Sequence, residues 1–337
     1  MTNWSKVVAV VPGGSNTDLV AGPVKLVGPG ELALGGRLMI GPGGKSRNVA
    51  QMMAAWLGPG RVAFLGRTLA AEKFGELDGR PAGAELDKYV YSLLAQVPMA
   101  ALERAGVVTD FVRRVSFAGT AGGAAAILVN AEGENTIYVL PGVNAEFSAA
   151  DVEAAAEIFA AAGRTGRGVL PLALEIPPAT ALTAARLARR YGLKVVLDPG
   201  GLSQGQECGE LLRLVDVLKP NEHEAQMLTG MAVTDERSAL EAARILRERH
   251  GLDQLVTTCG PRGVWVVDRR GARFHAALPL ARVVDTTGCG DQFMAVLCAG
   301  LAEGLSLDEA IPQAVRAAGL QAGRPGIQPV TRAEAGV

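Results

Sequence analysis

Short apolar runs alternate with helical segments along most of the chain. The runs have the length and content of buried strands and lie at residues 7–11, 61–65, 168–176, 194–198, 215–220 and 252–258. Segments with helical character lie between them, at residues 48–57, 149–162, 179–191, 222–229 and 235–250. Strands that alternate with helices predict a mostly parallel sheet with helices on both faces, which is an α/β fold of three layers.

Two glycine-rich segments do not fit this alternation. Residues 19–41 contain prolines and short apolar runs, and residues 111–140 include a predicted hairpin that turns at 132–134. We expect both segments to form a small second sheet that acts as a lid. Residues 67–106 are predicted to be helical, with an irregular loop near Gly79–Pro81. Because no low-complexity linker is present, we expect residues 1–337 to form one domain with this lid inserted into it.

Composition narrows the classes of function. The 33 Lys and Arg residues nearly balance the 34 Asp and Glu residues, which argues against a broad surface for nucleic acid. No apolar run approaches the roughly 18 residues that a membrane span needs. Four scattered cysteines and only three histidines argue against a zinc site. The cysteines are typical of reduced thiols, and we expect a cytoplasmic protein.

The segment Gly41–Ala50 contains Gly44-Lys45-Ser46, the residues that close a nucleotide-binding P-loop. The P-loop pattern requires a glycine where this chain has Met39, so the match fails. These residues alone leave two interpretations open. The lysine is either solvated beside a glycine turn, or it contacts a ligand at the start of the following helix.

A second glycine motif, Asp285–Asp291 (DTTGCGD), lies between a predicted strand at 281–284 and a long helix predicted from Asp291 to Gly304. Glycines let a ligand approach the backbone, and the first N–H groups of a helix favour an anion. This arrangement suits a phosphoryl group in transfer. Asp291 beside such a site would accept a proton from an attacking hydroxyl, or it would simply cap the helix.

The segments DTTGCGD and GGKSRNVA, the latter starting at Gly43, together resemble the two signatures of the PfkB, or ribokinase-like, carbohydrate kinases. The order and spacing agree from about residue 5 to residue 330, and the ribokinase branch is the most similar. The resemblance implies a ribokinase-like fold and transfer of the γ-phosphate of ATP to a primary sugar hydroxyl. It favours ribose, with fructose, a 2-keto-3-deoxy sugar acid or a nucleoside as alternatives.

The resemblance also assigns residues to the site. Asp291 would be the general base, and the backbone of Gly288, Cys289 and Gly290 would stabilise the transferring phosphoryl group. The residues matching the family's sugar pocket are Asn16, Asp18, Gly43, Gly44, Lys45, Asn48 and Glu175. Each has a structural alternative: Asn16 and Asp18 would suit a turn, and Glu175 would suit a strand end.

The nucleotide is expected beside a second set of residues. Those that match the family are Asn221, Glu224, Thr258, Gly260 and Gly263, with Mg²⁺ organised by the first two, largely through water. The resemblance further implies a K⁺ site formed by Asp285, Thr287, Arg324 and Gly326. It also implies a homodimer through the lid, because exposed sheet edges pair readily.

Several positions depart from the family pattern. Arg67-Thr68-Leu69 replaces a glycine–aspartate turn, Ser46 and Arg47 replace small residues, and the segment 76–105 is long for this family. We expect the Cys289 thiolate to be favoured at the helix start and alkylation there to inactivate the enzyme, unless the thiol is buried and inert.

Two other classes of function remain as alternatives. A dinucleotide-binding oxidoreductase lacks its glycine fingerprint after the first strand, where Val11–Asn16 stands. A non-catalytic sugar-binding protein would have no need of Asp291.

Overall fold

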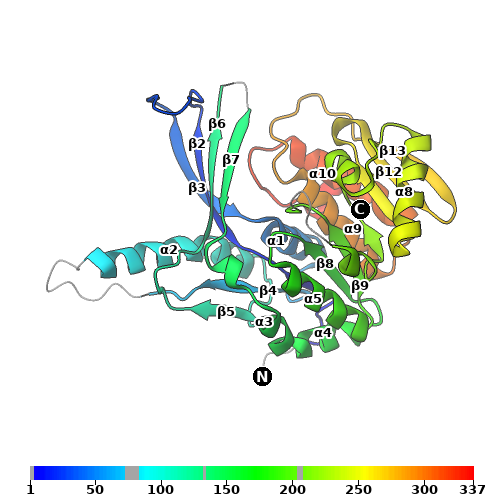
Figure 1. The fold of residues 1–337 in the computed structure, drawn as a ribbon, viewed down its shortest axis with the longest axis horizontal. Helices are drawn as coiled ribbons and strands as arrows, with labels where there is room; N and C mark the ends of the chain where they lie inside the picture. Colours follow the sequence, from blue (N-terminus) through cyan, green and yellow to red (C-terminus); the bar gives the residue numbers. More distant parts are fainter. Residues whose placement is uncertain (1–3, 73–82, 132–133, 203–207) are drawn as a thin grey trace.

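Two β-sheets organise the chain (Figure 1). The computed structural model describes residues 4–72, 83–131, 134–202 and 208–337. The large sheet has nine strands in the order β13-β12-β11-β10-β9-β8-β1-β4-β5, and the small sheet has the order β3-β2-β6-β7. All neighbours in the large sheet pair in parallel except β11–β12 and β12–β13. The predicted α/β fold with a mostly parallel sheet is confirmed.

The strands of the large sheet are β1 (Ala9–Pro12), β4 (Val62–Leu69), β5 (Val112–Val115), β8 (Val169–Ala173), β9 (Lys194–Asp198), β10 (Val217–Leu218), β11 (Leu255–Thr258), β12 (Gly263–Asp268) and β13 (Gly271–Ala276). Those of the small sheet are β2 (Asn16–Gly22), β3 (Arg37–Gly43), β6 (Gly123–Val129) and β7 (Asn135–Leu140).

The helices are α1 (Lys45–Leu57), α2 (Gly83–Arg104), α3 (Ala149–Ala154), α4 (Ala156–Gly163), α5 (Pro178–Arg190), α6 (Gly209–Leu212), α7 (Glu222–Thr229), α8 (Glu236–His250), α9 (Cys289–Glu303), α10 (Leu307–Ala322) and α11 (Arg332–Ala335). The 3₁₀ turns are η1 (Gly142–Glu146) and η2 (Gly260–Arg262).

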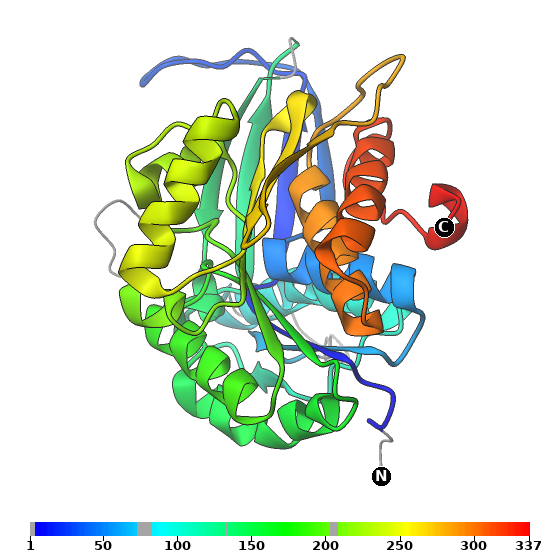
Figure 2. The ribbon, with the colours of Figure 1, turned by 90° about the vertical axis from the view of Figure 1, so that its right-hand side faces the viewer.

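The large sheet is covered on both faces, as its alternating strand residues require (Figure 2). In β9, Val196 packs into the core on one face, and its neighbours Val195 and Leu197 pack into the core on the other. Helices α1, α9 and α10 contribute to the first core, and α3, α4, α5 and α8 contribute to the second. The packing of α1 against α9 brings together two helix N-termini that were 240 or more residues apart in sequence.

The small sheet extends away from the large one (Figure 1). Strands β2 and β6 are parallel, whereas β2–β3 and β6–β7 are antiparallel. Strand β5 lies within the 111–140 range expected for the lid, yet it pairs with β4 in the large sheet. The small sheet is anchored at its base, where Thr17 Oγ1 donates a 2.6 Å hydrogen bond to the carbonyl of Leu94 in α2.

Some elements differ from the sequence predictions. The strand expected at 281–284 is wrong, because these residues are irregular and Val284 N–H instead bonds the carbonyl of Ala322 at the end of α10. The helix predicted over 149–162 is divided at Ala155, and α10 was not predicted. The predicted loop near Gly79–Pro81 and two residues of the turn at 132–134 lie outside the described residues.

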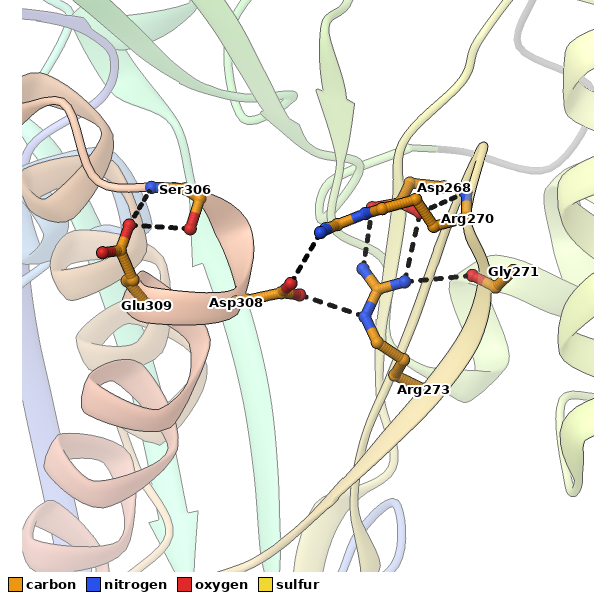
Figure 3. Close-up of polar contacts among 7 residues, drawn as sticks. All are labelled: Asp268, Arg270, Gly271, Arg273, Ser306, Asp308 and Glu309. Atoms are coloured by element: carbon orange, nitrogen blue, oxygen red, sulfur yellow. Dashed lines mark hydrogen bonds and ion pairs between the residues drawn. The ribbon is translucent and has the colours of Figure 1, made fainter.

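An ionic network fastens the β12–β13 hairpin to the start of α10 (Figure 3). Arg273 contacts Asp268 at 2.7 Å and Asp308 at 3.0 Å, and Arg270 contacts the same two carboxylates. Glu309 closes a capping box with Ser306 at the same helix end. The N-terminal end of α10 is therefore fixed to the sheet, and this helps to fix the position of Gln321 in the last turn of the helix.

Candidate active site

One edge of the large sheet gathers most of the predicted residues. The parallel strands β1, β8, β9, β10 and β11 all end at this edge, where open α/β sheets bind ligands. Asp198 and Thr258 are the last residues of β9 and β11, and Glu175 and Lys219 lie just after β8 and β10. The first turns of α1 and α9 contribute further residues, because Lys45 and Asn48 contact Asp291 there.

Asp291 lies in the first turn of α9 and is 7 % exposed. The helix begins at Gly288, whose φ of 76° is a left-handed conformation that favours glycine. The N–H groups of Gly290 and Asp291 have no intrahelical carbonyl to bond, so they are free to bind an anion. Asn48 Nδ2 donates a 2.7 Å hydrogen bond to Asp291 Oδ2, which fixes one oxygen and leaves the carboxylate able to accept further bonds.

Two lysines lie around this carboxylate. Lys45 Nζ is 3.7 Å from Asp291 Oδ1 and 3.8 Å from Asp198 Oδ2. Lys219 Nζ is 2.5 Å from Asp198 Oδ2, and both side chains are buried. A Cβ on Gly290 would lie 3.8 Å from Lys219 Nζ, so this ammonium is next to the N-terminus of α9. Two ammonium groups therefore lie among these carboxylates, at the place where a phosphoryl group would be transferred.

The surrounding groups keep Lys45 protonated and bring the pKa of Glu175 close to neutral pH. Burial lowers the pKa of Lys45, but the carboxylates of Asp198, Asp291 and Glu175 outweigh it and hold that pKa above its ordinary value. Burial raises the pKa of Glu175 to about 7, opposed by the Lys45 backbone and charge. Glu175 Oε2 accepts a 2.9 Å hydrogen bond from Lys45 N–H, and thus satisfies the start of α1, whose N-cap Gly44 has no side chain.

Arg47 is fully buried beneath this site. Its guanidinium donates to the carbonyls of Gly43 (3.2 Å) and Pro42 (2.8 Å) and to the side chains of Gln51 and Asn48. By donating to Asn48 Oδ1 it orients that amide, so that Nδ2 faces Asp291. Burial lowers the pKa of Arg47 to about 10, which leaves it cationic at neutral pH.

Asp18 lies in β2, and its carboxylate lies next to the backbone of Gly43. A Cβ on Gly43 would be 1.9 Å from the Asp18 carboxylate, so any larger residue there would displace that side chain. Burial raises the pKa of Asp18 to about 6; Arg47 lowers this pKa and Asp291 raises it further. The same part of the site contains Asn16, whose Oδ1 accepts a 2.8 Å bond from Asn144.

Asn221 and Glu224 form a capping box at the start of α7, through two reciprocal 2.8 Å bonds between side chain and backbone. Burial and the charge of Asp198 raise the pKa of Glu224, whereas Lys219 and Lys45 lower it. Asn221 also pairs with Thr258 as an isolated parallel bridge. Asn221, Glu224 and Thr258 therefore adjoin the lysine cluster formed by Lys45 and Lys219.

The turn after Thr258 contains two glycines in left-handed conformations. Gly260 has a φ of 53° and open space at its Cβ position. Gly263 has a φ of 136°, and a Cβ there would lie 2.2 Å from the carbonyl oxygen of His275. The glycine at 263 is therefore required by the neighbouring strand β13, whereas Gly260 leaves its backbone accessible.

The residues expected around K⁺ also meet. Asp285 accepts hydrogen bonds from Thr287 N–H at 2.8 Å and from Gly326 N–H at 2.9 Å. Burial raises the pKa of Asp285, but these bonds outweigh it and lower that pKa. Arg324 lies to one side, paired with Glu334 at 2.8 Å. Among the residues that the structure describes, no group of three or more His, Cys, Asp or Glu side chains could hold a metal.

Comparison with known proteins agrees with this geometry. The model of the pfkB family of carbohydrate kinases matches residues 93–333. Ribokinase of Haemophilus influenzae is 31 % identical over 94 % of this chain and 93 % of its own length, and ribokinase of Mus musculus is 32 % identical over 94 % and 91 %.

The chain belongs to the pfkB family of carbohydrate kinases. The structure of Arabidopsis thaliana ribokinase complexed with ribose and ATP covers 97 % of this chain and 96 % of its own, at 28 % identity and a TM-score of 0.78. The chain is thus an ATP-using phosphotransferase with an alcohol group as acceptor. No helix in the described parts of this kinase is long and apolar enough to cross a membrane.

Sequence reasoning missed four polar residues of this kinase that the structure brings to the site or its supports. They are Asp198, Lys219, Asn144 and Gln321. A signal existed for the first two, because each lies at the carboxyl end of a predicted strand. Asn144 and Gln321 lie in a 3₁₀ turn and in an unpredicted helix, and their contacts are made only in the folded kinase.

The arginine at 67 turns out to be structural. Arg67 Nε is 2.9 Å from Asp151, and its Nη1 is 3.1 Å from Glu146. Its guanidinium is thus paired with η1 and α3, which explains why an arginine can replace the expected turn residues. Ser46 packs over Gly13, where a Cβ would lie 1.9 Å from that of Ser46.

The expectation of a Cys289 thiolate is wrong. Burial raises the pKa of this thiol to about 11, and the negative charges of Asp285 and Asp291 raise it further. These effects outweigh the helix dipole that the sequence suggested. The alternative of an unreactive thiol is the one the surroundings favour.

Iodoacetamide should therefore label Cys289 slowly. At pH 8 we expect its rate of alkylation to be at least about tenfold below that of an ordinary exposed thiol, because the thiolate is scarce. Peptide mass spectrometry over time measures this rate, with the Cys289→Ser variant identifying the labelled peptide. Labelling at the rate of a free thiol would contradict the prediction.

Replacing Arg47 with Ala should destabilise the fold. The change leaves two buried carbonyls and the side chain of Asn48 without their donor, and at about 1–3 kcal/mol for each unsatisfied buried group the free energy of unfolding should fall by at least about 3 kcal/mol. Urea unfolding measures this cost, and Arg186→Ala is the control because its pair with Glu210 is solvent-exposed. A loss of less than about 1 kcal/mol for Arg47→Ala would show that its contacts are dispensable.

Proposed function

We propose that this kinase phosphorylates ribose, with transfer of the γ-phosphate of ATP to a primary hydroxyl. The observation that carries the proposal is Asp291, buried at an anion-binding helix start with Lys45 3.7 Å away. Support comes from the ribokinases that resemble the chain over nearly its full length, one of which was solved with ribose and ATP.

In the proposed mechanism Asp291 accepts the proton of the attacking hydroxyl. Of the predicted backbone donors, the Cys289 N–H already bonds the carbonyl of Thr286 at 3.2 Å, so the N–H groups of Gly288, Gly290 and Asp291 stabilise the charge on the phosphoryl group during transfer. Lys45 remains protonated and lies between Asp291 and Asp198, so it reduces the repulsion between carboxylate and phosphate. The hydroxyl oxygen forms a bond to phosphorus while the bond to the ADP oxygen breaks.

We assign the sugar to the region around β2, β3 and the start of α1. The polar groups there are Asn16, Asp18, Lys45, Asn48 and Glu175, and Gly43 and Gly44 leave space for a ring against the backbone. Buried polar groups each need a partner, so this lining favours a polyol over an apolar substrate.

We assign ATP to the adjacent region. Asn221, Glu224, Thr258, Gly260 and Gly263 lie around the lysine cluster or in the loop beside it. Glu224 keeps one carboxylate oxygen outside its capping bond, which is the kind of oxygen donor that Mg²⁺ prefers, whereas both oxygens of Asp198 already have partners. When bound, Mg²⁺ would neutralise charge on the phosphates.

The substrate alternatives differ in what the structure offers them. A sugar acid calls for a free arginine, but the guanidinium of Arg47 is already bonded to four groups of the protein. Fructose and nucleosides remain alternatives to ribose. An ADP-release assay over pentoses, hexoses, sugar acids and nucleosides tests the assignment, and preference for ribose in kcat/KM is the expected result.

The Asp291→Asn variant should lose most turnover. Removal of a general base lowers kcat by roughly 10²–10⁴-fold, while ribose affinity measured by calorimetry should stay within about threefold of the parent. Near-normal kcat in this variant would exclude Asp291 as the base.

We propose that the small sheet is a lid and that its outer face pairs with a second copy of the chain. Residues opposite one another in paired strands share a face. Leu38 and Ile40 therefore lie on the face of Thr17, which contacts α2, whereas Met39 lies on the face of Asp18, toward the site. Leu38, Met39 and Ile40 are each more than half exposed. An apolar outer face of this kind is typical of a homodimer.

Charge on the outer face should therefore dissociate the dimer. We expect Leu38→Glu to sediment as a monomer at micromolar concentration, since a buried unpaired carboxylate opposes association. Met39→Glu is the matched control on the same strand and should remain dimeric while the KM for ribose rises. A monomeric parent, or a dimeric Leu38→Glu variant, would exclude this interface.

We place the reaction in the cytoplasm, where ATP is available. All four cysteines are unpaired in the structure, as a reducing compartment allows.

A further inference from the structure

The loop before α9 and the loop after α10 lie against each other behind the start of α9. Val284 and Asp285 N–H groups both bond the carbonyl of Ala322, at 2.8 and 3.2 Å. One carboxylate oxygen of Asp285 accepts a hydrogen bond from Thr287 N–H, and the other accepts one from Gly326 N–H. This is the loop pair in which the family resemblance leads one to expect a monovalent cation.

Gln321 projects between these loops from the last turn of α10, and it is completely buried. Its Nε2 donates to the carbonyl oxygen of Gly326 at 2.6 Å and to that of Thr287 at 3.3 Å. An amide nitrogen has two hydrogens, and both are used. Its Oε1 finds no hydrogen-bond partner among the described residues, so the side chain is held by its donor end.

A cation in this position would need the same oxygen atoms. Potassium is bound in proteins by backbone carbonyl oxygens that replace its hydration shell. Here two of the carbonyls expected to serve it face the positive end of an amide dipole, and both Asp285 oxygens accept N–H bonds. Each of these oxygens keeps a second lone pair, but a cation would have to lie where Gln321 Nε2 and its hydrogens already are, within bonding distance of the Gly326 and Thr287 carbonyls. With the amide in this position, the residues do not fit a monovalent cation.

We propose that the Gln321 amide takes the place of the monovalent cation, so that this kinase turns over without K⁺. The amide joins the two loops as the ion would. Its bond to the Thr287 carbonyl is made one residue before Gly288, the residue at which α9 and its anion-binding turn begin. Gln321 is thus a positioning residue for the N–H groups of that turn, and the inference rests on the proposed phosphoryl transfer there.

The position of the amide is fixed from outside the site. Helix α10 is held at its N-terminal end by the Arg270 and Arg273 ion pairs (Figure 3). It also packs along α9. The helix therefore presents Gln321 to the loops from a rigid support, and no ion is required to assemble them.

The test compares potassium dependence in the parent and in Gln321→Ala. Turnover with ribose and MgATP is measured in choline chloride and in KCl at equal ionic strength. The parent should change by less than about twofold, since its carbonyls already have donors. The variant should lose about tenfold in choline chloride, within the 5–150-fold range typical of coupled sites, and recover in KCl.

Two controls make the result specific. Gln313→Ala makes the same change on the same helix and should behave as the parent in both salts. Gln321→Ser also removes the amide and leaves the space between the two carbonyls open to an ion, and it should repeat the potassium dependence of Gln321→Ala even if the apolar replacement folds poorly.

Thermal melting gives a readout that does not require turnover. KCl should raise the melting temperature of both Gln321 variants relative to choline chloride and leave that of the parent unchanged. This arm remains informative if the substrate is not ribose. Activation of the parent several-fold by K⁺, or loss of activity in both variants without any response to K⁺, would overturn the proposal.

Discussion

In the proposed mechanism, a negative carboxylate has to lie beside the place where a negative phosphoryl group is transferred, and the contacts of the site compensate for the repulsion between the two. Asp291 is held by Asn48 on one oxygen and by the ammonium of Lys45 near the other. Lys219 places a second positive charge near Gly290, and Asp198 holds both lysines. The free N–H groups of the first turn of α9 complete the compensation.

This compensation depends on the packing of α1 against α9, because the groups that hold Asp291 come from the other helix. Helix α1 follows its N-cap Gly44, and Glu175, in the loop after β8, accepts a hydrogen bond from the N–H of its first residue, Lys45. Arg47 then orients Asn48 from below. In the proposed mechanism, a turn that resembles a damaged P-loop thus contacts the sugar and the general base, and the phosphate chemistry belongs to α9.

Much of this could be predicted, and the limits have physical causes. The strand pattern indicated the fold and the glycine motif before α9 pointed to Asp291, because local sequence determines helix starts and strand ends. The resemblance to the family added Lys45 and Asn48. Asp198 and Lys219 could have been added from their strand-end positions. The partners of Arg47 and Gln321 could not, because their bonds join segments that only tertiary packing brings together. The Cys289 prediction was wrong since burial and two carboxylates outweighed the helix dipole.

The central claim is that Asn48 acts on catalysis through Asp291, and a double-mutant cycle on kcat tests it most directly. Single-turnover phosphoryl transfer would be measured for Asn48→Ala, Asp291→Asn, the double variant and the parent. The account predicts that Asn48→Ala lowers the rate of the parent by about tenfold and changes that of Asp291→Asn by less than about twofold. Equal factors in both backgrounds would contradict it, because Asn48 would then act independently of the carboxylate.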